Sequence, residues 1–140
     1  MAIKKIAVVG AGLMGSGIAQ VSAQAGFPTV VCEVNAQVLE KGMGSIKKFL
    51  AGGVEKGKVT QADMDKTLAN ITTTTKLEDF AGCDLVVEAI TENIGLKREL
   101  FGKLDAIVPD AILASNTSSL SITEMSTFVS TRRPHATAAA

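Results

Sequence analysis

The sequence is poor in the residues that build metal sites and disulfides. It contains two cysteines, Cys32 and Cys83, and a single histidine, His135, among 140 residues. Neither cysteine belongs to a C-x-x-C pair, so the spacing of common zinc sites is absent. Both cysteines lie in apolar stretches, which favours two buried thiols in a reducing compartment over a disulfide. We therefore predict no metal site.

Net charge and long apolar runs are also lacking. Fourteen Lys and Arg residues balance fourteen Asp and Glu residues, so no overall field draws the chain to nucleic acid or to an anionic membrane. The apolar segment behind Met1 is interrupted by glycines within a few residues, which fits neither a signal peptide nor a transmembrane span. We expect a cytoplasmic protein with no nucleic-acid or membrane partner. Its 140 residues, 46% of them hydrophobic, suffice for one domain with a core.

The most informative stretch is IAVVGAGLMGSGIA, residues 6–19. An apolar, β-branched run stops at Gly10 and a helical pattern begins at Met14, which predicts a strand, a tight turn and a helix. Gly10, Gly12 and Gly15 have the G-x-G-x-x-G spacing of dinucleotide-binding turns. There the first glycine permits the turn, the second lets the backbone approach a pyrophosphate, and the third lets the helix pack on the strand. The amides of the helix N-terminus would hold the diphosphate.

An acidic residue at the end of a second predicted strand, 29–34, indicates which dinucleotide is bound. Glu33 follows Gly15 by 18 positions (33 minus 15), close to the spacing of about 20 at which a carboxylate meets the adenosine ribose. A carboxylate there accepts both ribose hydroxyls and repels a 2′-phosphate, so NAD is favoured over NADP. The alternative is an exposed glutamate at a strand end.

The rest of the chain alternates helix and strand. Further helices are predicted over residues 36–50, 60–70 and 94–107, with the first ended or frayed by Gly52 and Gly53. Asn35 and Thr60 are the predicted N-caps of the first two of these helices, and Gly26 is the predicted C-cap of the helix that follows the glycine turn. Further strands are predicted over residues 72–75, 84–90 and 111–115. This alternation predicts an α/β fold with a doubly wound parallel sheet, in which ligands collect beyond the carboxyl ends of the strands. At those ends lie the glycine turn, Glu33 and residues 89–93 and 115–119.

Three strings carry a resemblance to a known family. GAGLMGSGIAQ, CDLVVEAITEN and ILASNTSSLSITE closely resemble the NAD-binding domain of the L-3-hydroxyacyl-CoA dehydrogenases, especially the bacterial 3-hydroxybutyryl-CoA dehydrogenases. SNTSSLSIT is the specific part. The resemblance implies a Rossmann-type domain over residues 1–134, a divergent tail over 135–140, and a sheet truncated before the family's later strands and its C-terminal helical domain.

The resemblance also implies the activity and the partners. The family transfers hydride between NAD and a CoA thioester, interconverting (S)-3-hydroxyacyl-CoA and 3-oxoacyl-CoA in fatty-acid or butanoate metabolism, and 3-hydroxybutyryl-CoA is the expected substrate. A homodimer is expected for the full-length enzyme, through the helical domain. The alternatives are an NAD-binding module without chemistry and a different dehydrogenase of the 3-hydroxyisobutyrate type, against which SNTSSLSIT argues.

Site residues follow from the resemblance by position. Glu92 and Lys97 match an E-N-x-x-x-K motif and would contact the nicotinamide half of NAD, although by themselves they suggest a charge pair on a helix face. Ser118 would hydrogen-bond the 3-oxygen of the substrate, and Asn116 would line the same pocket. The full set of expected cofactor contacts is Gly10, Gly12, Leu13, Met14, Gly15, Glu33, Ala89, Glu92, Lys97 and Ser118.

Two further features, a lysine cluster and the single histidine, are compared with the family's sequence pattern. Lys47, Lys48 and Lys56 form a basic cluster that charge alone would assign to a solvated helix face, whereas the family uses this helix for the phosphates of CoA. The family's catalytic histidine lies in a G-M-H-F-F-N-P motif and is oriented by a later glutamate. His135 instead follows a proline in RRPHATAAA, so we interpret it as an exposed tail residue. These 140 residues are therefore expected to lack the general base and to be inactive alone.

Overall fold

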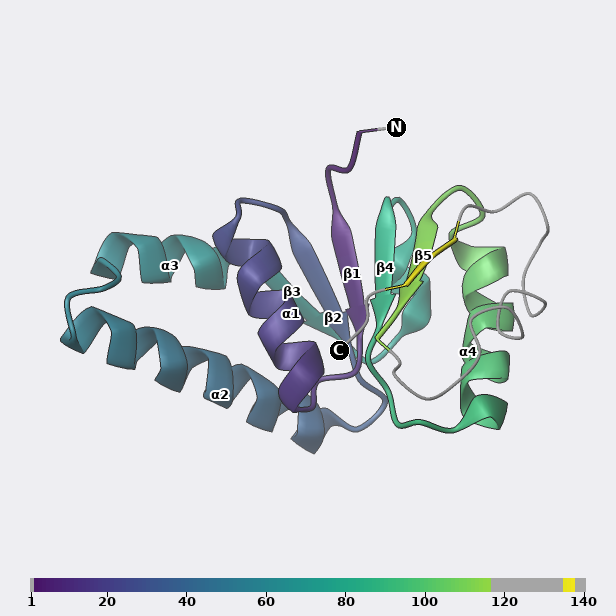
Figure 1. Ribbon diagram of the computed structural model, residues 1–140, viewed down its shortest axis with the longest axis horizontal. Helices are drawn as coiled ribbons and strands as arrows, with labels where there is room; N and C mark the ends of the chain where they lie inside the picture. The colour runs from purple at the N-terminus through teal and green to yellow at the C-terminus, as the bar shows by residue number, and fades with distance from the viewer. Residues whose placement is uncertain (1, 117–134, 138–140) are drawn as a thin grey trace.

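The computed structural model describes residues 2–116 and 135–137, and its strands form one parallel sheet (Figure 1). The strands are β1 (Ile6–Val9), β2 (Thr29–Cys32), β3 (Ile71–Thr74), β4 (Leu85–Glu88), β5 (Ile112–Ser115) and β6 (His135–Thr137). Their order is β3-β2-β1-β4-β5-β6, and every neighbouring pair is parallel. The chain reverses its direction of growth between β1 and β4, as in the doubly wound fold. The predicted fold class is confirmed.

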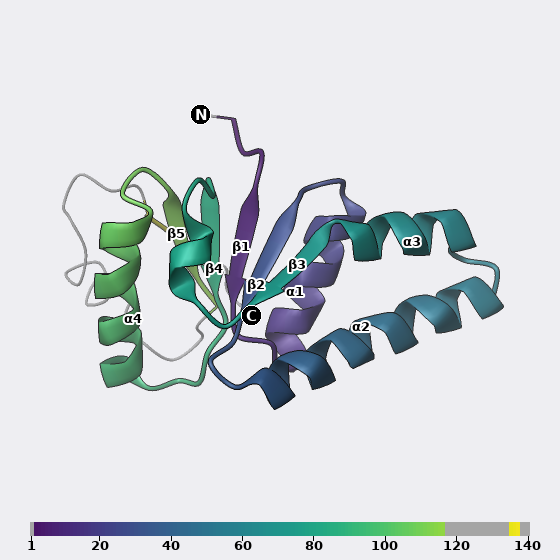
Figure 2. The same cartoon turned by 180° about the vertical axis from the view of Figure 1, so that it is seen from behind.

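Helices cover both faces of this sheet. They are α1 (Leu13–Gln24), α2 (Ala36–Glu55), α3 (Gln61–Ala69), α4 (Ile94–Ile107) and the short 3₁₀ helix η1 (Leu77–Phe80). Figures 1 and 2 show α1, α2 and α3 on one side of the sheet and α4 with η1 on the other, with α2 and α3 extending past the sheet as a pair. None of the helices in the described part of the chain is long and apolar enough to cross a membrane.

The core is divided by the sheet into two layers. Successive residues of a strand point to opposite faces, so Ile6 and Val8 pack with α1 and α2, while Ala7 and Val9 pack with α4. All four residues of β1 are buried. A strand covered on both faces needs apolar residues at every position, which explains the continuous rather than alternating pattern.

Local signals set several helix ends as predicted. The side chain of Asn35 caps α2 by accepting hydrogen bonds from the backbone N–H groups of Gln37 and Val38. Thr60 caps α3 through the N–H of Asp63. These caps satisfy amides that have no partner within the helix, which is why such residues mark helix starts.

The predicted end of α2 is wrong. We expected Gly52 and Gly53 to end or fray the helix near residue 50, but it continues to Glu55. The backbone turns at Gly57, whose φ is +74°, and the N–H of Lys58 donates to the carbonyl of Gly53 at 2.8 Å. A glycine at this left-handed position ends a helix in the Schellman manner, so position rather than glycine content decides the terminus.

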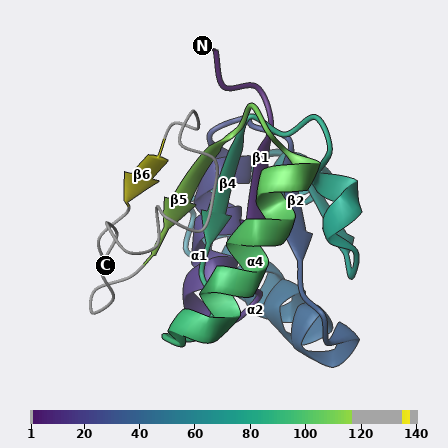
Figure 3. The same ribbon diagram turned by 90° about the vertical axis from the view of Figure 1, so that its right-hand side faces the viewer.

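A strand that the sequence analysis did not predict lies at the edge of the sheet. His135–Thr137, which we treated as part of a divergent tail, pairs in parallel with β5, with Leu113 opposite His135 and Ser115 opposite Thr137. Figure 3 shows it beside β5. The sheet thus extends past residue 134, where we placed the domain boundary. Of the three residues only threonine has a clear strand preference, so pairing with β5 decides this segment.

Candidate cofactor site

The glycine turn joins β1 to α1, and each glycine has a different structural reason. Gly10 has φ of +106°, and a Cβ there would lie 2.7 Å from the carbonyl oxygen of Ala89. A Cβ on Gly15 would lie 1.9 Å from the carbonyl oxygen of Gly10. A Cβ on Gly12 would meet nothing within 4 Å. Gly10 and Gly15 are therefore required by the turn itself, whereas Gly12 leaves open space, which fits the approach of a diphosphate.

The N-terminus of α1 has the properties of an anion site. Gly12 is the N-cap and makes no side-chain cap hydrogen bond, and the first turn holds no acidic residue. Leu13 is 91% exposed and Met14 is 49% exposed. The first amides of a helix lack partners within it and carry a partial positive charge, so this turn can bind a diphosphate through its backbone.

Glu33 lies directly beside this turn. The N–H of Ala11 donates to Oε2 of Glu33 at 3.2 Å, and the N–H of Val34 donates to Oε1 at 3.1 Å. The sequence spacing thus brings this carboxylate to the expected place at the carboxyl end of β2. Each oxygen can accept a further hydrogen bond, as two ribose hydroxyls would require.

The turns after β1 and β4 touch each other. The N–H of Ala89 donates to the carbonyl oxygen of Val9 at 2.9 Å, in addition to the close approach of Gly10 to Ala89. The chain leaves β1 for α1 on one face and β4 for α4 on the other. A crevice at such a point is where open α/β sheets bind their ligands.

Lys97 is not on an exposed helix face but fully buried. Its Nζ lies 2.6 Å from both carboxylate oxygens of Glu88 and 3.4 Å from Oε1 of Glu92. Glu88 is also fully buried, and its Oε1 accepts a hydrogen bond from Ser115 Oγ at 2.5 Å. Glu88 was not predicted as a site residue, because an acid at the end of an apolar strand gives no sign of which side chains it will contact.

Two predicted substrate residues follow β5. The N–H of Asn116 donates to the backbone carbonyl oxygen of Glu88 at 2.8 Å, which places Asn116 beside the end of β4. Ser118 lies outside the described residues. Asn116 and the Glu88–Lys97 pair therefore share the carboxyl edge of the sheet with the glycine turn.

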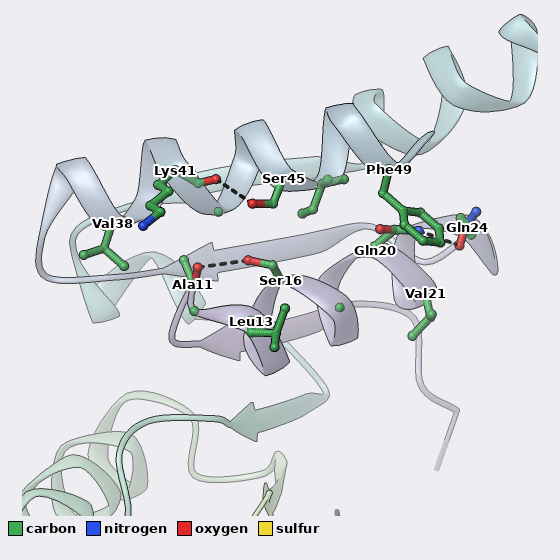
Figure 4. A pocket seen from close by; sticks show the side chains of 14 residues that line it. Ala11, Leu13, Ser16, Gln20, Val21, Gln24, Val38, Lys41, Ser45 and Phe49 are labelled. Carbon is green, nitrogen blue, oxygen red and sulfur yellow. Dashed lines mark hydrogen bonds between the residues drawn. The ribbon is translucent and has the colours of Figure 1, made fainter. Parts of the chain in front are cut away.

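A pocket of about 830 Å³ lies between α1 and α2 (Figure 4). Lys41, Ser45 and Phe49 line it from α2, opposite Ser16 and Gln20 of α1. The cluster of Lys47 and Lys48 on α2 and Lys56 at its C-cap is exposed but does not line the pocket. Lys41 was not singled out in the sequence. Its spacing with the other α2 residues of the pocket, three to four positions apart, could have indicated a shared face.

Both thiols are free and buried, as predicted. Burial raises the pKa of Cys32 to about 11, with a further contribution from the negative charge of Glu33. Burial also raises the pKa of Cys83. Neither thiol is therefore activated as a nucleophile. Within residues 2–116 and 135–137, no group of three or more His, Cys, Asp or Glu side chains could hold a metal ion.

Comparison with known proteins adds the family. A family model described as the NAD-binding domain of 3-hydroxyacyl-CoA dehydrogenase matches residues 5–139. The chain belongs to the 3-hydroxyacyl-CoA dehydrogenase family. It matches the family's NAD-binding domain, so NAD is the cofactor and the resemblance seen in the sequence is confirmed.

Individual relatives agree with this assignment. A probable 3-hydroxybutyryl-CoA dehydrogenase of Deinococcus radiodurans is 53% identical over 124 residues, covering 88% of this chain and 44% of the relative. The crystal structure of FadB2 from Mycobacterium tuberculosis superposes with a TM-score of 0.93 at 42% identity, covering 96% of this chain and 48% of that one. That of (S)-3-hydroxybutyryl-CoA dehydrogenase PaaH1 from Ralstonia eutropha gives 0.91 at 36% identity, covering 96% and 48%. This member of the dehydrogenase family thus spans about half the length of these relatives.

Proposed function

We propose that the chain is the cofactor-binding half of an NAD-dependent enzyme that interconverts (S)-3-hydroxyacyl-CoA and 3-oxoacyl-CoA. The expected substrate is 3-hydroxybutyryl-CoA, in fatty-acid or butanoate metabolism. This proposal rests on one observation. The glycine turn, the pair of Glu92 and Lys97, and Asn116 lie together at the carboxyl ends of β1, β4 and β5. These are the groups needed for a dinucleotide and for the oxygen of a substrate carbonyl.

Different residues bind different parts of the cofactor. When bound, NAD supplies the hydride acceptor at its nicotinamide ring. The amides of the glycine turn bind the diphosphate, and Glu33 accepts hydrogen bonds from the adenosine ribose. Glu92 and Lys97 orient the nicotinamide half. Ser118 hydrogen-bonds the 3-oxygen of the substrate, a role worth about 10²-fold in rate if it resembles one donor of an oxyanion hole. Asn116 lines the same pocket.

None of the residues named above is assigned the role of general base. His135 is the chain's one histidine and directly follows Pro134, and no G-M-H motif surrounds it. We expect the 140-residue chain to bind NAD and to turn over acetoacetyl-CoA negligibly, because nothing then takes or returns the proton on the 3-oxygen.

Two measurements test this function. Calorimetric titration should show binding of NAD⁺ in preference to NADP⁺, and absence of NAD⁺ binding would refute the cofactor role. Oxidation of NADH with acetoacetyl-CoA should be close to background. Robust turnover would show that His135 or another group acts as the base.

A second candidate is an NAD-binding module without chemistry. The observation that favours it is the same lack of a histidine in the family's catalytic motif. Native mass spectrometry separates the two: a discrete oligomer that retains NAD supports a module in its own right. A monomer that aggregates supports one half of a longer enzyme.

The partners follow from the same proposal. We propose an acyl-CoA as substrate, with its phosphates near Lys47, Lys48 and Lys56 and with Lys41 in the neighbouring pocket as an additional cation. We further propose a homodimer of the full-length enzyme through a helical domain. A cytoplasmic location without nucleic-acid or membrane partners fits the balanced charge of the chain.

A further inference from the structure

A carboxylate that the proposed function does not use lies at the centre of the crevice. Glu88 is the last residue of β4, and its side chain is fully buried. Its Oε2 accepts a hydrogen bond from the N–H of Ile90 at 2.8 Å, and its Oε1 accepts from Ser115 Oγ at 2.5 Å. Lys97 Nζ approaches both oxygens at 2.6 Å. One carboxylate therefore joins β4, β5, α4 and the turn that follows β4.

The polar groups of this cluster are fully used. Both oxygens of Glu88 accept two contacts each, and within the described residues no buried side-chain nitrogen or oxygen lacks a hydrogen-bond partner. The ammonium of Lys97 has three N–H donors, and three carboxylate oxygens surround it: two from Glu88 and, at 3.4 Å, one from Glu92. The shorter contacts hold Lys97 on the side of Glu88.

Stability alone is a poor explanation for such a pair. Removing two charges from water costs about as much as their attraction returns, and apolar residues of similar volume often replace buried pairs without loss. A buried pair whose hydrogen bonds are all formed instead fixes one geometry, because every alternative position of its side chains leaves a charge or a hydrogen bond unsatisfied. The groups that Glu88 holds are the turn at Ala89–Glu92, Lys97 and the backbone leading to Asn116.

We propose that Glu88 is a positioning residue for the nicotinamide end of the cofactor site. It fixes Lys97 and, through the N–H of Ile90, the turn after β4. Through Ser115 it fixes the start of the Asn116 segment. This inference rests on the proposed function, which places the nicotinamide half at Glu92 and Lys97. The adenosine half is held by the glycine turn and Glu33, to which the side chain of Glu88 makes no hydrogen bond.

This division of the site suggests a test with two probes. ADP carries the adenosine and the diphosphate, whereas NAD⁺ carries the nicotinamide riboside as well. We expect Glu88→Gln to weaken binding of NAD⁺ by about tenfold, as for the loss of one charged hydrogen bond, and to change the dissociation constant of ADP by less than about twofold. An equal loss for both ligands, or no loss for either, would overturn the proposal, because a merely structural role cannot change their ratio.

Two further variants keep the test decisive. Glu99→Gln removes an exposed carboxylate that pairs with Lys103 on the same helix at 3.3 Å, and both affinities should stay unchanged. If Glu88→Gln does not fold, Ser115→Ala tests the role of Glu88 in its place, because this variant removes one hydrogen bond to Glu88 and leaves both charges of the pair. It should weaken NAD⁺ by about threefold with ADP unchanged, and a different ratio rejects the role of Glu88.

Binding of NAD⁺ and ADP to the unaltered chain shows whether a failure concerns this inference or the proposed function. If it binds neither NAD⁺ nor ADP, the proposed function itself fails. If it binds NAD⁺ no more tightly than ADP, the cofactor role stands but the positioning role of Glu88 is refuted, since the nicotinamide end would then contribute nothing to binding.

Discussion

Alanine at Gly12 and at Gly15 should separate cofactor binding from folding. The two glycines are three positions apart in the same turn, but an added Cβ at Gly12 meets nothing within 4 Å, whereas one at Gly15 would lie 1.9 Å from the carbonyl oxygen of Gly10. An ordinary contact between carbon and oxygen is about 3.3 Å or longer. Gly15→Ala therefore requires α1 to move away from β1 by more than about 1 Å.

The magnitudes follow from these distances. Overpacking against rigid backbone costs about 3 kcal/mol or more, so Gly15→Ala should lower the melting temperature by about 10 °C or more. Gly12 has an extended backbone with φ of −71°, which alanine adopts freely, and the lost N-cap preference costs about 1 kcal/mol at most. Gly12→Ala should thus stay folded but bind NAD⁺ at least about tenfold more weakly, because its methyl group occupies the space open to the diphosphate.

Thermal unfolding followed by circular dichroism and titration calorimetry with NAD⁺ measure the two effects separately. Gly44→Ala serves as the control, since Gly44 is exposed in the interior of α2 and a Cβ there meets nothing within 4 Å. That variant should gain up to about 1 kcal/mol of stability from helix propensity. The reasoning is refuted if Gly12→Ala loses as much stability as Gly15→Ala, or if it keeps full affinity for NAD⁺.

Three further predictions concern the groups around the turn. Glu33→Gln should weaken NAD⁺ and narrow its preference over NADP⁺, since the charge that repels a 2′-phosphate is gone; an unchanged ratio in calorimetry would contradict the ribose role. Gly42→Ala should lower both stability and NAD⁺ affinity, because its Cβ would lie 2.4 Å from the carbonyl oxygen of Ala11 and would push α2 from the turn; a melting temperature like that of Gly44→Ala would exclude this contact. Because the pKa of Cys32 is raised from 9.0 to about 11, the folded chain holds that proton more tightly than the unfolded chain. The free energy of unfolding should therefore fall as pH rises from 9 to 11, and alkylation of Cys32 at pH 8 should run about 100-fold slower than that of an ordinary thiol; fast alkylation of the native chain would contradict its burial.

Features that depend on neighbours in the chain were predicted well. They include the strand that stops before Gly10, the caps Asn35 and Thr60, and the turn at Gly26. These follow from rules on backbone geometry and helix ends, which act over a few residues. Gly26 lies one position past the C-cap of α1, which is Ala25 rather than Gly26 as predicted; its φ of +97° is the left-handed conformation with which a glycine ends a helix. The place of Glu33 beside the turn was also predicted, because a βαβ unit brings the ends of its two strands together.

Features that depend on distant contacts were missed or misplaced. The end of α2 was also misplaced, although it is a local feature: the helix ends at Glu55 rather than at Gly52 and Gly53, because the left-handed turn at Gly57 and its hydrogen bonds decide the terminus. The strand at residues 135–137 forms through pairing with β5. Lys41 faces a pocket that exists only because α1 and α2 pack against each other.

The sequence by itself determined the glycine turn and the choice of NAD, since both follow from spacing within a unit of about thirty residues. It also determined the fold class, which follows from the alternation of helix and strand along the chain. Only the tertiary structure decided what surrounds the charges at the crevice. Lys97 and Glu88 lie nine positions apart, and nothing in their spacing shows that both become buried and that Ser115, 27 positions from Glu88, completes the group. Burial and partnership arise when the sheet and α4 close around these side chains, and the cost of leaving a buried charge unpaired then selects one arrangement.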